Sequence, residues 1–201
     1  MTHKVTMLDL RKNLLDALSK TGRASSDYDL NKDVVLPQNR VLTPASVLIA
    51  VRAQTSSLIL TKRSAKLKHH PGQIAFAGGK QDVDDADAVA TALREAREEI
   101  GLMPANVEVL GCLPAHETVT GYRVTPVIAL VHGAFDPLPE VGEVADVFEV
   151  PLSHVTNPAS FRIEGRHWQG HRRQYFVVPF GPYYIWGATA RILRALADRM
   201  T

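Results

Sequence analysis

The sequence predicts an α+β fold in which a mixed β-sheet is covered by α-helices. The chain has 201 residues, which suits a single domain with a sizeable core. Short runs of branched apolar residues, which are typical of strands, recur along most of its length. The few segments with helical periodicity do not alternate with these runs, and this pattern argues against a doubly wound parallel sheet.

The first segment predicts an amphipathic helix followed by an extended arm. Residues 7–20 carry leucines close to helical spacing: Leu8, Leu10, Leu14, Leu15 and Leu18. Residues 21–44 are rich in turn-forming residues and are expected to form a linker or a wrapping arm. We therefore expect residues 1–42 to form an N-terminal helix and arm, and residues 43–201 to form the main domain.

Most of the remaining chain predicts strands. Residues 45–53 and 56–63 resemble a strand pair joined by a tight turn. Residues 67–85 are loop-like, with one short central strand. Further strands are expected at 106–115, 122–133 and 144–152, and on both sides of Gly170 within 161–180. Residues 185–200 predict a final amphipathic helix with Ile192, Leu193 and Leu196 facing inward.

Composition is ordinary and excludes several classes of function. Apolar residues make up 45% of the chain, charged residues 22%, and the net charge is +2, so charge gives no case for nucleic acid or a membrane surface. No apolar run approaches the roughly 20 residues needed to cross a bilayer. The single cysteine, Cys112, cannot form a disulfide within the chain and is expected to be a buried thiol in a strand. These features favour the cytoplasm.

The clearest helix is expected over residues 86–101, and it is unusually acidic. Asp84 or Asp85 is expected to cap its start, and Gly101 to end it. Its packing face is expected to consist of Val89, Leu93, Ala96 and Ile100. Its three glutamates fall in a sector of about 100° well away from that face: Glu95, Glu98 and Glu99.

Two interpretations of this acidic cluster are open. Glu95 and Glu99 form a like-charge i,i+4 pair that costs a few tenths of a kcal/mol, and Arg94 relieves it in part by reaching Glu98. The cluster is either a solvated polar face or one side of an oxygen-rich pocket completed by the Gly78–Gly79 turn. A pocket of this kind suits hard divalent cations such as Mg²⁺ or Mn²⁺, which in turn suit phosphate substrates. Residues 82–87 lack the spacing of a calcium loop, and residues 72–80 lack that of a phosphate-binding loop.

Residues Arg94–Leu102, "REAREEIGL", resemble the second half of the Nudix box, which reads Arg-Glu-apolar-any-Glu-Glu-any-Gly-apolar. The first half departs from the family pattern. Asp85 stands where the family generally has Glu. Eight residues lie between Asp85 and Arg94, where the family usually has seven. The resemblance implies a Nudix fold, a mixed sheet between helices, and hydrolysis of a nucleoside diphosphate linked to a second group.

A second stretch, residues 60–79, resembles the extended signature of the coenzyme A pyrophosphatase branch of this family. The positions in register are Thr61, Arg63, Ser64, Lys68, Gly72, Phe76, Gly78 and Gly79. Lys68 stands where Arg is usual, and Ala77 replaces Pro. The segments around Tyr122 and residues 185–193 are also similar to this branch, so the resemblance covers roughly residues 43–200.

The resemblance implies a role for each of these residues. Glu95, Glu98, Glu99 and the Gly79 carbonyl would bind Mg²⁺ or Mn²⁺. Arg94 would hold the glutamates by ion pairing. The general base is left open between Glu98, Glu143 and Asp146, and Glu143 alternatively is a solvated loop residue.

The expected substrate is coenzyme A or a related nucleotide. Its implied binding residues are Arg63, Ser64, Lys68, Gly72, Gln73, Phe76 and Tyr122. Alternatively, the basic run is an exposed strand edge with its loop, and Tyr122 is a half-buried strand residue. ADP-ribose or a dinucleotide as substrate, and a silent nucleotide-binding module, are the competing functions. The partner is expected to be a small molecule rather than nucleic acid or a membrane, and a homodimer is allowed.

Overall fold

The structure is a computed structural model that describes residues 6–37, 39–168 and 171–201. Its helices are α1 (Met7–Ser19), α2 (Ala88–Ile100), α3 (Leu152–Val155) and α4 (Gly187–Met200), with 3-10 turns η1 (Pro104–Asn106) and η2 (Pro158–Ser160). Its strands are β1 (Ser25–Ser26), β2 (Thr43–Arg52), β3 (Ser57–Arg63), β4 (Ile74–Ala75), β5 (Ala77–Lys80), β6 (Val107–Cys112), β7 (His116–Glu117), β8 (Tyr122–Val131), β9 (Val144–Pro151), β10 (Arg162–Trp168) and β11 (His171–Val177).

The main sheet is mixed and is built around β2. This strand pairs in parallel with β8 along its whole length and antiparallel with β3 and β5. The short β1 joins β7 in parallel, while β6 and β9 extend the sheet beyond β8 and β3. Strands β10 and β11 form a separate antiparallel hairpin. The predicted mixed sheet, the strand pair and the two strands flanking residues 169–170 are all confirmed.

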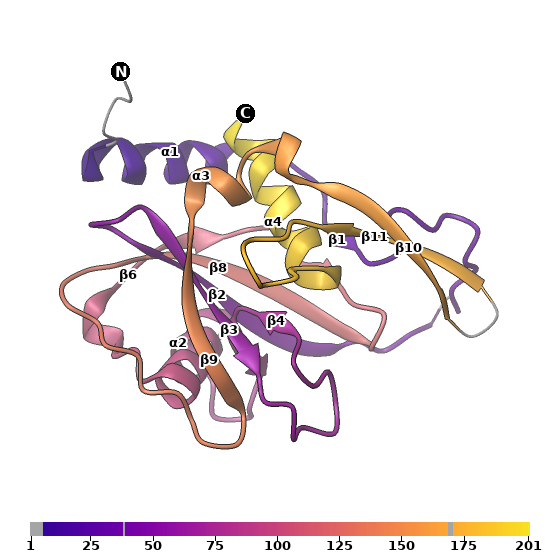
Figure 1. The fold of residues 1–201 in the computed structure, drawn as a ribbon, viewed down its shortest axis with the longest axis horizontal. Coiled ribbons are helices and arrows are strands. Elements are labelled where there is room, and N and C mark those ends of the chain that lie inside the picture. The colour runs from indigo at the N-terminus through magenta and orange to yellow at the C-terminus, as the bar shows by residue number, and fades with distance from the viewer. Residues whose placement is uncertain (1–5, 38, 169–170) are drawn as a thin grey trace.

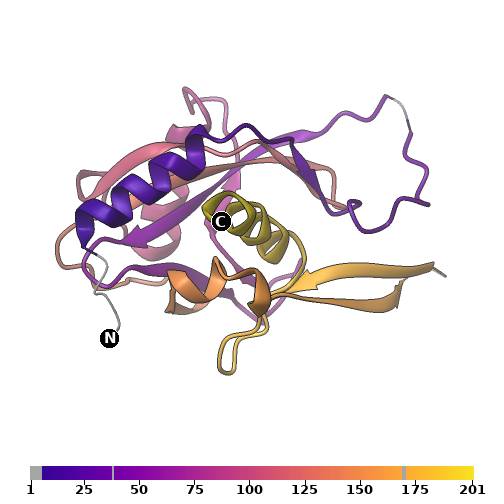
Figure 2. The same cartoon turned by 90° about the horizontal axis from the view of Figure 1, so that it is seen from above.

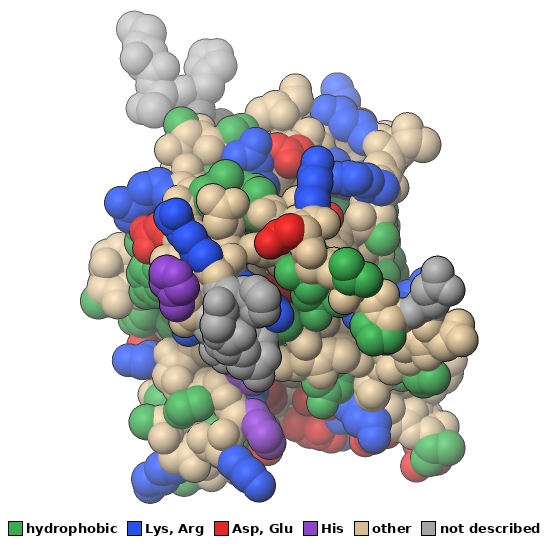
Figure 3. All heavy atoms as spheres, turned by 90° about the vertical axis from the view of Figure 1, so that its right-hand side faces the viewer, with side chains coloured by type: hydrophobic (Ala, Val, Ile, Leu, Met, Phe, Trp, Pro, Cys, Tyr) green, Lys and Arg blue, Asp and Glu red, His purple; other side chains and the backbone are tan. Residues whose placement is uncertain are grey.

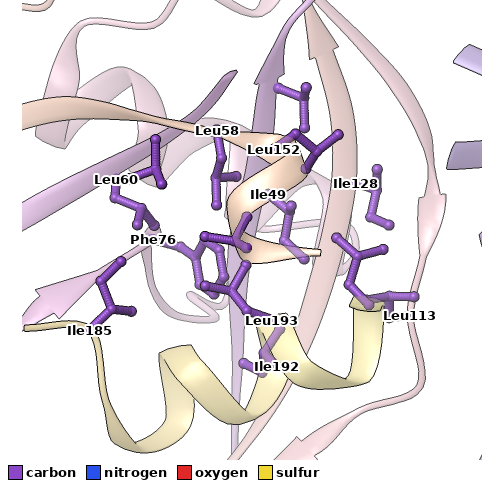
Figure 4. Packing of buried hydrophobic residues seen from close by; sticks show 14 of the residues in the cluster. Ile49, Leu58, Leu60, Phe76, Leu113, Ile128, Leu152, Ile185, Ile192 and Leu193 are labelled. Atoms are coloured by element: carbon purple, nitrogen blue, oxygen red, sulfur yellow. The ribbon is translucent and has the colours of Figure 1, made fainter. Parts of the chain in front are cut away.

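Helices cover both faces of the sheet (Figures 1 and 2). Alternate residues of β2 point to opposite sides, because side chains along a strand alternate between faces. Ile49 and Val51 belong to a core shared with α1 and α4, whereas Leu48 and Ala50 pack with residues of α2. In Figure 4, Ile192 and Leu193 of α4 lie close to Ile49 and Phe76. The predicted α+β sandwich is therefore confirmed, as are the inward-facing residues of the last helix.

The described part of residues 1–42 contributes to the same core. Leu10 and Leu14 of α1 are buried against α4 and the sheet. Farther along the arm, the Asn31 side chain makes two hydrogen bonds with the backbone of Gln174 in β11, at 2.9 and 2.8 Å. Asp29 forms a 2.6 Å ion pair with Arg191 of α4. The arm therefore packs along the surface of the domain, against β11 and α4.

Leu8 is 76% exposed on the outer side of α1. Two sequence expectations about local structure are wrong. Cys112 is exposed rather than buried, because β6 pairs with β8 alone among the described strands and Cys112 ends it. The loop at 67–85 contains two short strands, β4 and β5, rather than one. In the part of the chain that the structure describes, no helix has the length and apolarity required to span a bilayer.

Candidate active site

The Gly78–Gly79 pair lets the carboxylates of α2 approach the sheet. Gly78 and Gly79 lie in β5 opposite Val47 and Ser46 of β2. A Cβ atom at Gly78 would lie 2.4 Å from the Ser46 carbonyl oxygen, so β5 and β2 could not keep this approach. A Cβ atom at Gly79 would lie 2.5 Å from the Glu95 Oε1 atom. The second glycine is therefore the position that leaves room for a carboxylate.

Helix α2 begins later than expected. Asp87 is its N-cap and accepts a 2.8 Å hydrogen bond from the Ala90 N–H. The expectation of a cap at Asp84 or Asp85 is wrong, because the Asp85 carboxylate is occupied by Arg94. The predicted C-cap is confirmed: Gly101 has φ +72°, a left-handed conformation that glycine adopts without steric cost.

The expected packing face of α2 is confirmed. Ala96 and Ile100 are buried, and the half-buried Val89 and Leu93 pack against the same core cluster. Glu99 is 5% exposed and lies on the packed side, where it accepts a 3.1 Å hydrogen bond from the Gly78 N–H. The expectation that all three glutamates lie away from the packing face is therefore wrong for Glu99. It holds for Glu98, whose side chain is 50% exposed.

Glu95 and Glu99 are partly or fully withdrawn from solvent. Burial raises the pKa of Glu99 to about 7, although the Gly78 N–H opposes this shift. Burial likewise raises the pKa of Glu95. The negative charge of Glu143 contributes to both upward pKa shifts. A cation placed among these carboxylates would be favoured.

Arg94 gathers the acidic side chains around one guanidinium group. Its Nη1 donates to Glu95 and to Glu98, both at 2.9 Å, which confirms the expected i,i+4 contact. Its Nε and Nη2 donate to the two oxygens of Asp85 at 3.0 and 2.9 Å. This bidentate pair fixes the plane of the guanidinium and holds the pKa of Asp85 well below its usual range.

Asp85 is the residue whose contribution was missed. It precedes α2 in the chain, and the backbone N–H of Asp82 donates to it at 2.9 Å, which fixes the turn before the helix. The sequence contained a signal, since Asp85 occupies a position where the Nudix family generally has an acidic residue. The extra residue between Asp85 and Arg94 obscured the role of Asp85, because it changes the spacing by which the Asp85–Arg94 pair would be recognised.

The segment bearing Glu143 is attached to the end of α2. The backbone N–H groups of Leu138 and Glu140 donate to the carbonyl oxygens of Ile100 and Glu99, each at 2.9 Å. The Ser64 N–H donates to the Glu143 carbonyl at 2.7 Å. Buried Ser64 is thus placed to support this loop, whereas the Glu143 side chain is exposed.

Asp146 has a neutral side-chain partner, whereas Glu98 accepts its hydrogen bond from the Arg94 guanidinium. The Tyr183 hydroxyl donates to its Oδ2 at 2.7 Å. The Tyr183 ring stacks on Phe148, with ring centroids 3.5 Å apart. Asp146 is therefore engaged in packing the end of β9.

A groove of about 620 Å³, called here the active-site groove, opens beside the glycine pair. Its lining residues are Ala45, Ser46, Val47, Arg63, His69, His70, Gly78, Gly79, Lys80, Thr120, Tyr122 and Val124. Two of the predicted substrate-binding residues, Arg63 and Tyr122, line it. The cations Arg63 and Lys80 thus share one groove with the backbone that adjoins Glu95.

The other predicted substrate-binding residues lie around this groove in different ways. Lys68 is exposed on the loop after β3 and does not line the groove. Gly72, at φ +70°, closes that loop by donating its N–H to the Arg63 carbonyl at 3.2 Å. Gln73 is half-buried and lines an adjoining cavity. Phe76 is 3% exposed and packs in the core, with part of its ring at that same cavity.

The donor atoms beside the groove suit a hard divalent cation in kind. They are the carboxylate oxygens of Glu95, Glu98 and Glu99 and a backbone carbonyl at Gly79, which carries no side chain to fill the space. Among the described residues, no three acidic, His or Cys side chains are already gathered as a ligand set. Arg94 instead holds Glu95 and Glu98.

Comparison with known proteins decides the family. The sequence model of the NUDIX domain matches residues 42–171. The chain belongs to the Nudix family. Nudix hydrolases act on phosphoric anhydrides and generally use divalent metal ions such as Mg²⁺ or Mn²⁺, so this chain is a hydrolase of that class.

Several Nudix relatives are similar over most of their length. An uncharacterized Nudix hydrolase, NudL, from Enterobacter sp. (strain 638) is 38% identical over 182 residues, which cover 85% of this chain and 95% of that protein. NudL from Escherichia coli (strain K12) is 41% identical over 154 residues, covering 76% and 80% of the two chains. The crystal structure of a MutT/nudix family protein from Enterococcus faecalis has a TM-score of 0.49 at 16% identity, covering 84% of this chain and 65% of that chain.

Proposed function

We propose that this Nudix hydrolase cleaves the diphosphate of coenzyme A or acyl-coenzyme A, giving adenosine 3′,5′-bisphosphate and (acyl) phosphopantetheine. The observation that carries the proposal is the active-site groove itself. Its wall combines the Gly79 backbone, against which Glu95 lies, with the cations Arg63 and Lys80. A diphosphate needs both a place for metal ions and direct cationic partners.

Each residue of α2 has a distinct task in this proposal. Glu95, Glu98, Glu99 and the Gly79 carbonyl hold Mg²⁺ or Mn²⁺. When bound, these ions neutralise the diphosphate and lower the pKa of an attacking water. Arg94 is a positioning residue, because its contacts fix the orientation of the glutamates.

The proton of the attacking water is accepted by Glu98 or Glu143. Both side chains are exposed, so they can exchange protons with solvent. Asp146 is less suited, because it is half-buried and the Tyr183 hydroxyl donates to it. Arg63 faces the same groove and is assigned to the phosphate oxygens of the substrate.

The choice of coenzyme A rests on the loop between β3 and β4. This loop carries the residues that resemble the coenzyme A pyrophosphatase branch, among them Arg63, Ser64 and Gly72. Coenzyme A carries a 3′-phosphate besides its diphosphate, and the loop supplies the side chains of His69 and His70 to the groove as further hydrogen-bonding groups. The departures at Lys68 and Ala77 keep ADP-ribose or a dinucleotide as the competing substrate.

A substrate panel tests the proposal. The purified protein is given Mg²⁺ or Mn²⁺ together with coenzyme A, ADP-ribose or a dinucleoside polyphosphate, and the products are separated by chromatography. We expect coenzyme A to give the highest kcat/KM, with adenosine 3′,5′-bisphosphate as one product. A preference for ADP-ribose or the dinucleotide would contradict the substrate assignment while leaving the hydrolase class intact.

A single carboxylate substitution tests the site. Glu98→Gln removes a charge at the same size and is expected to lower kcat by about 100-fold or more, since it removes a metal ligand or the base. The matched control is Asp84→Asn, which removes one charge from an exposed residue ahead of α2 and is expected to leave kcat unchanged. Equal rates for Glu98→Gln and the wild type would remove Glu98 from the site.

A further inference from the structure

The active-site groove continues into two more cavities toward the β10–β11 hairpin. The first, of about 280 Å³, shares Val47, Arg63, His70 and Thr120 with the groove. The second, of about 230 Å³, is called here the hairpin cavity and shares His70, Thr120, Arg166 and Trp186 with the first. His70 and Thr120 line all three. A ligand whose diphosphate lies beside Gly79 thus has a path toward the hairpin.

An aromatic platform forms one wall of the hairpin cavity. Trp186 immediately precedes α4, and Tyr175 of β11 meets it edge to face, with ring centroids 5.2 Å apart. The Arg166 guanidinium lies 4.5 Å from the centroid of the Trp186 ring. Aromatic rings and guanidinium planes both stack on nucleobases, so this wall is suited to an unpaired base.

Two arginines, Arg166 and Arg173, line the same cavity. Arg166 and Arg173 are directly opposite each other in the hairpin, which places two like charges on one face. Asp27 is the acid that lines the cavity, but its carboxylate is engaged by the buried His116 ring at 3.1 Å and by the Val119 N–H at 2.9 Å. An anionic group of a ligand placed between Arg166 and Arg173 could accept hydrogen bonds from both guanidinium groups.

Glu164 is the other acid on this face of the hairpin. It accepts a 2.7 Å hydrogen bond from the Tyr184 hydroxyl and does not line the cavity. Figure 3 shows the side of the molecule where the hairpin ends; Lys and Arg side chains are spread over this side, and acidic side chains occur among them and in its lower part. Phosphate is the anion that matches paired arginines next to an aromatic ring.

We propose that the hairpin cavity binds the adenosine 3′-phosphate half of the substrate. The base stacks on the Arg166–Trp186 pair, and the 3′-phosphate accepts hydrogen bonds from Arg166 and Arg173. This inference rests on the proposed function, because it takes the substrate to be a nucleoside diphosphate derivative with one additional phosphate. It assigns the neutral pantetheine half to the opposite end of the active-site groove.

The test compares coenzyme A with 3′-dephospho-coenzyme A. Arg166→Gln is expected to raise KM for coenzyme A about 10-fold, the cost of losing a charged hydrogen bond to phosphate, while kcat stays within about twofold. KM for the dephosphorylated substrate should change much less. Arg173→Gln is the second variant and is expected to show the same discrimination.

Arg172→Gln is the matched control. It removes the same charge from the same strand, but Arg172 lies on the other face of the hairpin, as the alternation of side chains requires. It should leave both KM values unchanged. Thermal melting of the three variants is measured alongside to show that each remains folded. An equal KM increase for both substrates, or an equal effect of Arg172→Gln, would overturn the assignment.

Binding of adenosine 3′,5′-bisphosphate provides a readout that needs no turnover. By calorimetry, the wild type should bind this nucleotide at least 10-fold more tightly than Arg166→Gln does. Binding of this kind without hydrolysis of coenzyme A would refute the proposed function and keep the subsite. Hydrolysis of coenzyme A with unchanged KM in both arginine variants would refute the subsite and keep the function.

Discussion

At the residue scale, two adjacent glycines have different tasks. Gly78 lies against backbone atoms of Ser46 and Val47, whereas Gly79 lies against the end of a side chain, the carboxylate of Glu95. Backbone in a paired strand cannot move without disturbing the sheet, but a side chain can change its rotamer. The first glycine is therefore a requirement of folding, and the second is a requirement of the site.

Alanine substitutions separate these two tasks. Gly78→Ala is expected to lower the free energy of unfolding by about 1–3 kcal/mol, the usual cost of overpacking, measured by thermal or urea unfolding. Gly79→Ala is expected to keep wild-type stability and to lower kcat about 10- to 100-fold, because the Glu95 carboxylate must move. Loss of stability at Gly79 with full activity would contradict this division.

Asp85 is expected to support activity without touching the substrate. Asp85→Ala removes the bidentate partner of Arg94 and should lower kcat about 10- to 100-fold, as loss of a supporting contact behind metal ligands does. Asp85→Glu should recover most of that loss, because it restores a carboxylate that can reach the guanidinium. Steady-state kinetics with KM and kcat determined separately provides the measurement. Equal damage from both substitutions would show that Arg94 does not depend on this carboxylate.

At the element scale, the sequence predicted which segments form helices and strands better than it predicted where a helix is capped and which of its side chains are buried. The position of α2 followed from its periodicity and from Gly101, but its N-cap depended on which aspartate Arg94 engages, a contact between the preceding loop and the helix. Burial of Glu99 depended on the approach of Gly78 in β5, which helical spacing alone does not contain. Both the N-cap of α2 and the burial of Glu99 therefore depend on contacts with other segments, which the local sequence pattern does not contain.

The packing of α1 yields a stability prediction. Leu14 is 0% exposed, and Leu14→Ala is expected to lower the free energy of unfolding by about 2–5 kcal/mol through lost burial and a cavity. Leu8→Ala is the same substitution at an exposed position of the same helix, and it should alter the free energy of unfolding by less than about 0.5 kcal/mol. Chemical denaturation measures both. A small effect at Leu14 would mean that α1 is not part of the cooperative core.

At the scale of the whole molecule, the arm and the hairpin shape the region where the groove ends. Asp27 and Asn31 of the arm line the hairpin cavity together with Gln174 and Tyr175 of β11, more than 140 residues away in the chain. Sequence motifs predicted only the part of the candidate site that comes from contiguous segments, namely α2, the glycine pair and the loop after β3. They did not identify the hairpin cavity, because its walls come from segments that only the fold brings together.

The most direct test of this account is whether a divalent ion binds where α2 meets β5. Crystals of the protein soaked in MnCl₂ would be examined by anomalous diffraction at the manganese edge. We predict an anomalous peak within coordination distance of carboxylate oxygens of Glu95, Glu98 or Glu99 and the Gly79 carbonyl, and no such peak in crystals of Glu98→Gln treated in the same way. Wild-type crystals with these carboxylates facing only water and Arg94 would contradict it.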